Sequence, residues 1–90
     1  MSLEPSYTNQ FEKDLKLCKK RNKKIDKLKT ILSMLIDEIP ISVKNKDHKL
    51  LENYQGRREC HIEPDWLLIY KIENKNIVFE RTGSHSDLFD

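Results

Sequence analysis

The chain has 90 residues, of which 37% are hydrophobic and 36% are charged, and its formal net charge is +2. A chain of this length supports one hydrophobic core, so we expect a single domain over residues 1–90. No stretch approaches the roughly 18 apolar residues of a membrane-spanning helix, and the N-terminus lacks a signal-peptide pattern. We therefore expect a soluble, cytoplasmic protein with no membrane partner.

The first elements are a short strand and a helix. Residues 2–7 form a weak candidate strand, which Pro5 would restrict to the edge or the start of a sheet. Asn9 and Glu12 have the spacing of a helix capping box, which predicts a helix over residues 9–20. The apolar positions that follow at helical spacing are Phe11, Leu15 and Cys18.

A second helix is predicted after a short break, over residues 25–36, and it must end before Pro40. Its apolar stripe consists of Ile25, Leu28, Leu32, Leu35 and Ile36. Because the break between the two helices is short, we expect them to form a hairpin.

The region that contains both helices is strongly basic. From Glu12 to Lys29 the chain carries nine basic and three acidic residues, a local net charge of +6. Such a block favours a polyanion partner through contacts with phosphates and the release of counterions. A solvated helix surface is an equally good interpretation of this block taken alone.

Residues 40–55 lose the helical period and are rich in Lys, Asn and Asp. We predict a functional loop there, with one turn of structure and with His48 in its middle. Residues 57–62 then alternate in polarity as a strand does. This alternation places His61 and Ile62 on opposite faces of a sheet.

Two further strands complete the predicted sheet. Pro64 interrupts the pairing, an apolar and aromatic strand resumes over residues 66–72, and residues 73–76 connect it to a last strand over residues 77–81. The order β-α-α-β-β-β predicts a two-layer α+β domain, in which the helical hairpin packs on one side of a mainly antiparallel sheet.

Histidines and carboxylates in polar segments predict an active site. All three histidines lie in the second half of the chain, and His48 and His85 each have an aspartate within two positions. Imidazoles such as that of His61 exchange protons near neutral pH, and Asp65 can orient an imidazole or act as a base itself. We expect these residues to form one site assembled from distant turns.

Charged and aromatic side chains nearby suggest a nucleic-acid substrate. Arg57, Arg58 and Arg81 supply planar donors with a fixed positive charge, which a transition state on a phosphate requires. Trp66 and Phe89 are candidates to stack on unpaired bases. Packing in the core is the alternative for Trp66, and docking of the C-terminal tail is the alternative for Phe89.

A zinc site is the competing chemistry, although no strong ligand signature such as HExxH is present. Its candidate ligands are His48, His61 and His85 with one of Asp47, Asp65 or Asp87. Cys18 and Cys60 lack a partner at metal-ligand or redox spacing, so we expect two reduced thiols rather than a disulfide.

Three segments resemble the YafQ-like branch of the RelE/ParE toxin superfamily: residues 47–50 (DHKL), 58–70 (RECHIEPDWLLIY) and 81–89 (RTGSHSDLF). The resemblance covers nearly the whole chain, and the HxxPDW and RxGSHxxLF patterns at this separation are specific. One departure lies in the loop, where relatives commonly read His-Pro-Leu-x-Gly and residues 48–52 read HKLLE. The shape of this loop is therefore expected to differ.

The resemblance implies a microbial RNase-like fold and the toxin of a bacterial type II toxin-antitoxin pair, an endoribonuclease that cuts messenger RNA on the ribosome. It implies a cognate antitoxin and the 70S ribosome with its messenger RNA as partners, and we expect the toxin alone to be monomeric. The expected catalytic residues are His48, His61, Asp65 and His85. The expected substrate-binding residues are Arg58, Trp66, Arg81 and Phe89, and the expected ribosome-binding residues are Lys19, Lys20, Lys23 and Lys24.

The expected reaction needs no metal or cofactor, because the 2′-hydroxyl of RNA supplies the nucleophile. We assign His85 as the general acid, Asp65 or His48 as the base, and His61 with Arg81 to the scissile phosphate. The alternatives are a non-enzymatic binding toxin like gyrase-poisoning members of the superfamily, in which the histidines are incidental, and a zinc-dependent hydrolase.

Overall fold

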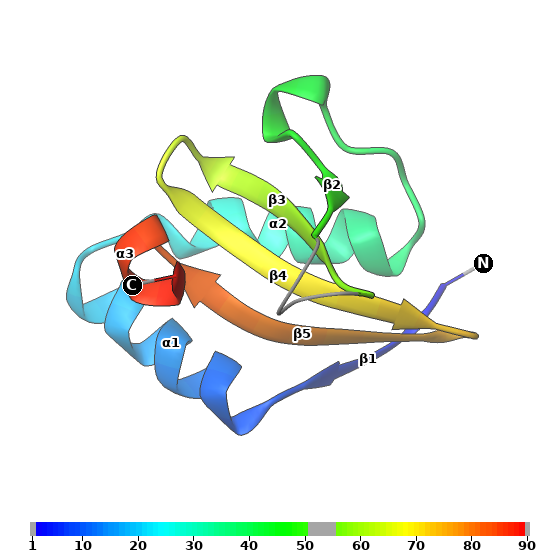
Figure 1. The fold of residues 1–90 in the computed structure, drawn as a ribbon, viewed down its shortest axis with the longest axis horizontal. Coiled ribbons are helices and arrows are strands. Elements are labelled where there is room, and N and C mark those ends of the chain that lie inside the picture. Colours follow the sequence, from blue (N-terminus) through cyan, green and yellow to red (C-terminus); the bar gives the residue numbers. More distant parts are fainter. Residues whose placement is uncertain (1, 51–55, 90) are drawn as a thin grey trace.

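The order of elements follows the predicted pattern, with short additions. The computed structural model describes residues 2–50 and 56–89. Its elements are β1 (Glu4–Tyr7), α1 (Asn9–Lys20), α2 (Ile25–Ile36), a 3-10 turn η1 (Val43–Asn45), β2 (His48–Lys49), β3 (Arg58–Glu63), β4 (Trp66–Glu73), β5 (Asn76–Gly83) and α3 (His85–Phe89) (Figure 1). None of the helices within the described ranges is long and apolar enough to cross a membrane.

Five strands form one sheet in the order β1-β5-β4-β3-β2. All neighbouring pairs are antiparallel except β1 and β5, which run parallel, so the prediction of a mainly antiparallel sheet is confirmed. Pro5 lies in β1 at the edge, as expected from its missing N–H. The predicted loop over residues 40–55 contains the expected turn, η1, but also the short edge strand β2, which was not predicted. Residues 51–55 lie outside the described part of the chain.

The two long helices have the predicted bounds, but the start of α1 is capped differently. Asn9 was expected to cap the helix, whereas it is the first helical residue and Thr8 precedes it as the cap. The Thr8 hydroxyl oxygen accepts a hydrogen bond from the backbone N–H of Phe11 at 2.9 Å, and the hydroxyl donates to the carbonyl oxygen of Glu80 at 2.9 Å. Thr8 therefore fixes the helix to β5 as well as satisfying a free N–H.

Both helices pack against one face of the sheet, with α1 beside β5 and α2 behind β3 and β4 (Figure 1). The main core lies between these layers and includes Phe11, Leu28, Leu35, Cys60, Trp66, Leu68, Tyr70 and Phe79. Cys18 and Cys60 are both buried free thiols, as expected, and burial raises the pKa of Cys60 to about 12.

A smaller apolar cluster lies on the opposite face, where Leu67 and Ile69 of β4 contact Leu88 of α3. This helix was not predicted, because five residues are too few to show a helical period. Its start has a recognisable signature, since the backbone N–H of Asp87 donates to the Ser84 hydroxyl at 3.1 Å and that of Ser84 donates to Asp87 Oδ2 at 2.9 Å. Ser84 followed three residues later by Asp87 is thus a capping box that the sequence reading missed.

Candidate functional site

The predicted site residues on β2 and β3 share the sheet face that the long helices leave open. Cys60 and Ile62 of β3 belong to the main core, so His61 points to the other face, as predicted. His48 of β2 lies directly opposite Glu59 of β3, and cross-strand partners share a face. The open face therefore carries His48, Glu59 and His61 together.

Glu59 lies between the two imidazoles. Its Oε1 atom is 3.4 Å from Nε2 of His48 and 3.5 Å from Nε2 of His61. The Glu59 side chain is only 6% exposed, whereas that of His48 is 49% exposed. Sequence reasoning did not single out Glu59. The signal was present, because a strand period of two puts a residue two positions before His61 on the same face.

His85 reaches the same face from the first turn of α3. The His61 and His85 ring centroids are 6.1 Å apart, and those of His85 and Phe89 are 6.0 Å apart. Phe89 lies beside His85 and is partly exposed to solvent. The structure thus brings together three histidines from β2, β3 and α3, together with one aromatic ring.

Asp65, in the turn between β3 and β4, orients His85. Its Oδ1 accepts a hydrogen bond from the backbone N–H of His85 at 3.0 Å and lies 3.1 Å from the ring atom Nδ1. The backbone hydrogen bond, followed by the contact with the ring, lowers the pKa of Asp65 below its usual value. With Nδ1 turned to Asp65, the Nε2 atom of His85 is left for a substrate.

Trp66 is fully buried in the main core, so the structure decides between its two predicted roles in favour of packing. Its indole N–H donates to the Thr82 hydroxyl oxygen at 3.0 Å, and Lys23 Nζ lies 5.8 Å from the ring centroid. The expected contact of Trp66 with RNA is therefore wrong, because the ring is fully buried and no face of it is open to a base. Trp66 lies at the start of β4 and its side chain packs in the main core.

The two arginines expected at the substrate are engaged elsewhere. Arg58 lies opposite Tyr70 in the sheet and so faces the helix layer, where its Nε atom donates to Asp47 Oδ1 at 3.0 Å. Arg81 Nε donates to Oδ2 of the buried Asp14 of α1 at 2.8 Å. The structure does not bring Arg58 to the histidines, and the guanidinium of Arg81 already neutralises a carboxylate.

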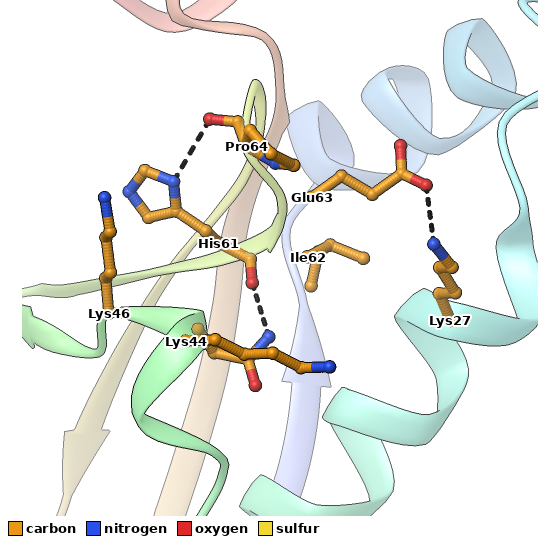
Figure 2. Close-up of a pocket in the computed structure, with 8 residues that line it drawn as sticks. Lys27, Lys44, Lys46, His61, Ile62, Glu63 and Pro64 are labelled. Carbon is orange, nitrogen blue, oxygen red and sulfur yellow. Dashed lines mark hydrogen bonds and ion pairs between the residues drawn. The ribbon is translucent and has the colours of Figure 1, made fainter.

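A pocket of about 330 Å³ adjoins His61 and is lined by Lys27, Lys44, Asn45, Lys46, His61, Ile62, Glu63 and Pro64 (Figure 2). The side-chain amide of Asn45 donates to the carbonyl oxygen of His61 at 2.6 Å, which fixes η1 against β3. Lys27 pairs with Glu63 at 2.9 Å on the far side of the pocket. The three lysines make the pocket suited to an anionic ligand. Lys27, Lys44 and Lys46 were not predicted as site residues from the sequence.

The expected zinc alternative lacks a suitable donor set in the described ranges. Within residues 2–50 and 56–89, no three side chains of His, Cys, Asp or Glu lie in an arrangement that would hold a metal ion. His48 and His61 converge instead on one carboxylate, and His85 pairs with another. The arrangement suits proton transfer at a phosphate better than metal binding.

Comparisons with known proteins identify the family of the chain. A family model described as "Bacterial toxin of type II toxin-antitoxin system, YafQ" matches residues 3–90. The chain is 48% identical over 84 residues to the mRNA interferase toxin YafQ of Escherichia coli (strain B / BL21-DE3), a match that covers 92% of this chain and 91% of the relative.

Two solved structures have closely similar folds. The crystal structure of YafQ from E. coli strain BL21(DE3) superposes with a TM-score of 0.93 at 44% identity, covering 98% of this chain and 99% of that one. The toxin in the E. coli DinJ-YafQ toxin-antitoxin complex gives a TM-score of 0.92 at 43% identity, with 100% of both chains covered. The similarity of fold therefore extends over nearly the whole chain.

Proposed function

Because this chain belongs to the YafQ family of toxins from bacterial type II toxin-antitoxin systems, we propose that it is an endoribonuclease that cuts messenger RNA on the translating ribosome. The observation that carries the proposal is the convergence of His48, His61 and His85 on one sheet face, with Asp65 behind His85. Three imidazoles on one open face provide proton donors and acceptors near neutral pH.

The proposed reaction is a transesterification within the RNA. The 2′-oxygen attacks the adjacent phosphorus, the bond from phosphorus to the 5′-oxygen breaks, and the products are a 2′,3′-cyclic phosphate and a 5′-hydroxyl. The RNA supplies the nucleophile, so the protein has to orient it, move two protons and stabilise charge on the phosphate. No metal ion is needed for these tasks.

The geometry supports a specific division of roles. His85 is the general acid for the 5′-oxygen, because Asp65 holds its Nδ1 atom and leaves Nε2 for the substrate. Asp65 is better suited to orienting His85 than to acting as the base, because its lowered pKa makes it a weak proton acceptor. The base is then His48, whose half-exposed ring has Nδ1 against the Lys46 carbonyl oxygen at 2.6 Å.

The remaining groups position the phosphates. His61 shares Glu59 with His48 and lies 6.1 Å from His85 between ring centroids, and it contacts the scissile phosphate. Phe89 stacks on a base next to the cut. Lys44 and Lys46, in the pocket beside His61, take over the phosphate contacts that were expected of Arg58. Arg81 contributes by holding Asp14 and β5 in place.

The proposed partners are the ribosome and a cognate antitoxin. The E. coli relative has been crystallised in complex with DinJ, and a similar antitoxin would silence this chain. The exposed basic side chains of Lys19, Lys20 and Lys24, with the partly buried Lys23, would bind ribosomal RNA.

The test is translation of a defined message in a purified system, with and without the protein, followed by mass analysis of the RNA ends. We expect cuts with 2′,3′-cyclic phosphate and 5′-hydroxyl ends only on translated message, and the same cuts after EDTA treatment of the toxin. Equal cutting of free RNA would contradict ribosome dependence. Loss of cutting with EDTA, reversed by added zinc, would contradict the metal-independent mechanism, and an intact message would contradict nuclease activity.

A further inference from the structure

The strand that carries His48 is very short. β2 consists of His48 and Lys49 only, and it lies at the edge of the sheet with β3 as its one neighbour. Segments with few backbone hydrogen bonds open most readily, whereas a catalytic group has to be held within about 0.5 Å of its reactive position. The rest of the constraint on His48 must therefore come from side chains around β2.

Asp47, the residue before His48, is held by two donors from the neighbouring strands. Its Oδ1 atom accepts a hydrogen bond from Nε of Arg58 in β3 at 3.0 Å, and its Oδ2 atom accepts one from the hydroxyl of Tyr70 in β4 at 2.7 Å. Tyr70 is buried in the main core. Burial, followed by the hydrogen bond to Asp47, raises the pKa of Tyr70 above its usual value, so the hydroxyl remains a donor. Asp47 thus connects the edge of the sheet to its rigid centre.

Lys46, two residues before His48, turns this anchorage into an orientation of the ring. It has a left-handed backbone (φ 50°), and its carbonyl oxygen lies 2.6 Å from Nδ1 of His48. A residue other than glycine keeps this conformation only where its surroundings hold it, and both neighbours of Lys46 are tied to β3, Asn45 through the His61 carbonyl oxygen and Asp47 through its carboxylate. Because a carbonyl oxygen only accepts, Nδ1 of His48 carries the proton and Nε2 is left as the basic atom.

We propose that Asp47, held by Arg58 and Tyr70, is a positioning residue that keeps the base His48 in its reactive place and tautomer. This inference rests on the proposed function. Asp47, Arg58 and Tyr70 line a pocket with Leu35 of α2, on the helix side of the sheet, whereas His48 lies on the open face. Asp47 therefore acts through His48 and forms or breaks no covalent bond itself. Arg58, which the sequence placed at the substrate, contributes through the same carboxylate.

The role predicts an effect on the chemical step rather than on binding, because RNA on the open face makes no contact with Asp47. Initial rates of cleavage are measured against the concentration of programmed ribosomes. We expect kcat to fall at least about 10-fold in Asp47→Ala with KM within about twofold, and Asp47→Asn, which can still accept one of the two hydrogen bonds, to recover part of the loss.

Tyr70→Phe removes one donor to Asp47 and keeps the ring in the core. We expect a smaller fall in kcat, of at least about threefold, again with little change in KM. Tyr7→Phe is the matched control, because it removes the same hydroxyl from β1 at the other edge of the sheet, and it should cleave at nearly the wild-type rate.

Combination with His48→Ala separates positioning from a structural role. If Asp47 acts through His48, Asp47→Ala should lower cleavage by less than about twofold when His48 is already absent. A carboxylate that only stabilises the fold would lower cleavage by the same factor in both backgrounds, in parallel with the melting temperature. Single-turnover reactions with excess toxin give the slow rates that this comparison needs.

A second measurement needs no activity and uses the free toxin. Nitrogen-15 NMR at pH ~8, where an imidazole is neutral, distinguishes the two tautomers of each ring. We expect the two ring nitrogens of His48 to differ strongly in the wild type, as in a single tautomer, and to draw together in Asp47→Ala. The signals of His85, which is held by Asp65, should stay the same.

Separate outcomes address the inference and the function it rests on. An uncut message with wild-type protein contradicts the proposed function, and the NMR comparison then still tests whether Asp47 orients His48. Unchanged kcat in folded Asp47→Ala, or equal losses with and without His48, would overturn the inference. Unaltered His48 signals in Asp47→Ala would overturn it as well.

Discussion

His85 is the residue on which the proposed chemistry depends most directly. Its ring is exposed and held by Asp65, so its removal leaves the core untouched. We predict that His85→Ala lowers cleavage by about 10²–10⁴-fold, the usual contribution of a positioned acid, with little change in melting temperature. Ser86→Ala, the exposed neighbour in α3, is the control for a change in the same helix. Near-normal cleavage by folded His85→Ala would refute its assignment as the general acid.

Asp87 links stability to pH through a single ion pair. Arg21 donates to its carboxylate at 2.6 Å and, with the backbone N–H of Ser84, holds the pKa of Asp87 at about 2. Because this pKa is lower in the folded than in the unfolded chain, the stabilisation is present above pH ~4 and is lost as the pH falls toward 2. We predict that Asp87→Asn lowers the free energy of unfolding at pH 7 by about 1–2 kcal/mol, after allowance for partial exposure.

Urea denaturation of both proteins across this pH range checks the prediction for Asp87. The difference between the wild type and Asp87→Asn should shrink steadily below pH ~4, where the wild-type carboxylate begins to lose its advantage. A difference that stays constant down to pH 2 would show that the ion pair with Arg21 is not its source.

At the scale of elements, the placement of α3 depends on the absence of a side chain at Gly83, just before the helix. A Cβ atom added at Gly83 would lie 2.9 Å from Asp87 Oδ2 and 3.0 Å from Asp87 Cβ. Asp87 cannot yield freely, because Arg21 and Ser84 hold it. The junction of β5 and α3 therefore accepts glycine and little else.

We predict that Gly83→Ala displaces α3 and with it His85, so that cleavage falls by at least about 10-fold while the free energy of unfolding falls by about 1–3 kcal/mol. Cleavage assays and urea denaturation give the two numbers. Asn76→Ala, an exposed change at the opposite end of β5, is the control and should leave both near wild type. A wild-type cleavage rate in Gly83→Ala would mean that α3 does not set the position of His85.

The long elements were predictable, and the two elements that were missed, β2 and α3, are short. α1, α2 and the three long strands show several periods of apolar residues, whereas β2 has two residues and α3 has five. The site was predictable to the extent that its histidines stand outside the apolar pattern. The neighbours of a side chain depend on tertiary packing, so the burial of Trp66 and the diversion of Arg58 to Asp47 could not be read from the sequence.

Glu59 shows the same limit at the site itself. Its strand position predicted its face, but its contact with His48 depends on β2, which has only two residues. The capping signal at Ser84 was available in the sequence and would have predicted α3.

At the scale of the whole molecule, positive charge is concentrated on the two long helices and their connection, where residues 12–29 carry a local net charge of +6. Lys20 and Lys24 are exposed at the end of α1 and just before α2, close to the connection between the helices. We predict that Lys20→Glu with Lys24→Glu weakens ribosome association at least about 10-fold at 0.1 M salt and flattens its salt dependence, since phosphate contacts release counterions. Stability should change by only a few tenths of a kcal/mol, because both side chains lie outside the core.

Sedimentation with purified ribosomes at several salt concentrations measures this effect. Lys71→Glu with Lys75→Glu applies the same change of charge near the turn between β4 and β5, far from the helix connection (Figure 1). Equal weakening by both pairs would indicate a general charge effect instead of a binding surface on the helix layer.

The order in which the site's segments occur along the chain affects when the toxin becomes active. β1 forms the edge of the sheet by pairing with β5, and His85 and Phe89 are supplied by α3, which follows β5. During synthesis, a chain that has emerged only as far as β4 has two of its three site histidines and lacks both His85 and Phe89. The face that carries the three histidines can therefore be complete only after residues 85–89 have left the ribosomal exit tunnel.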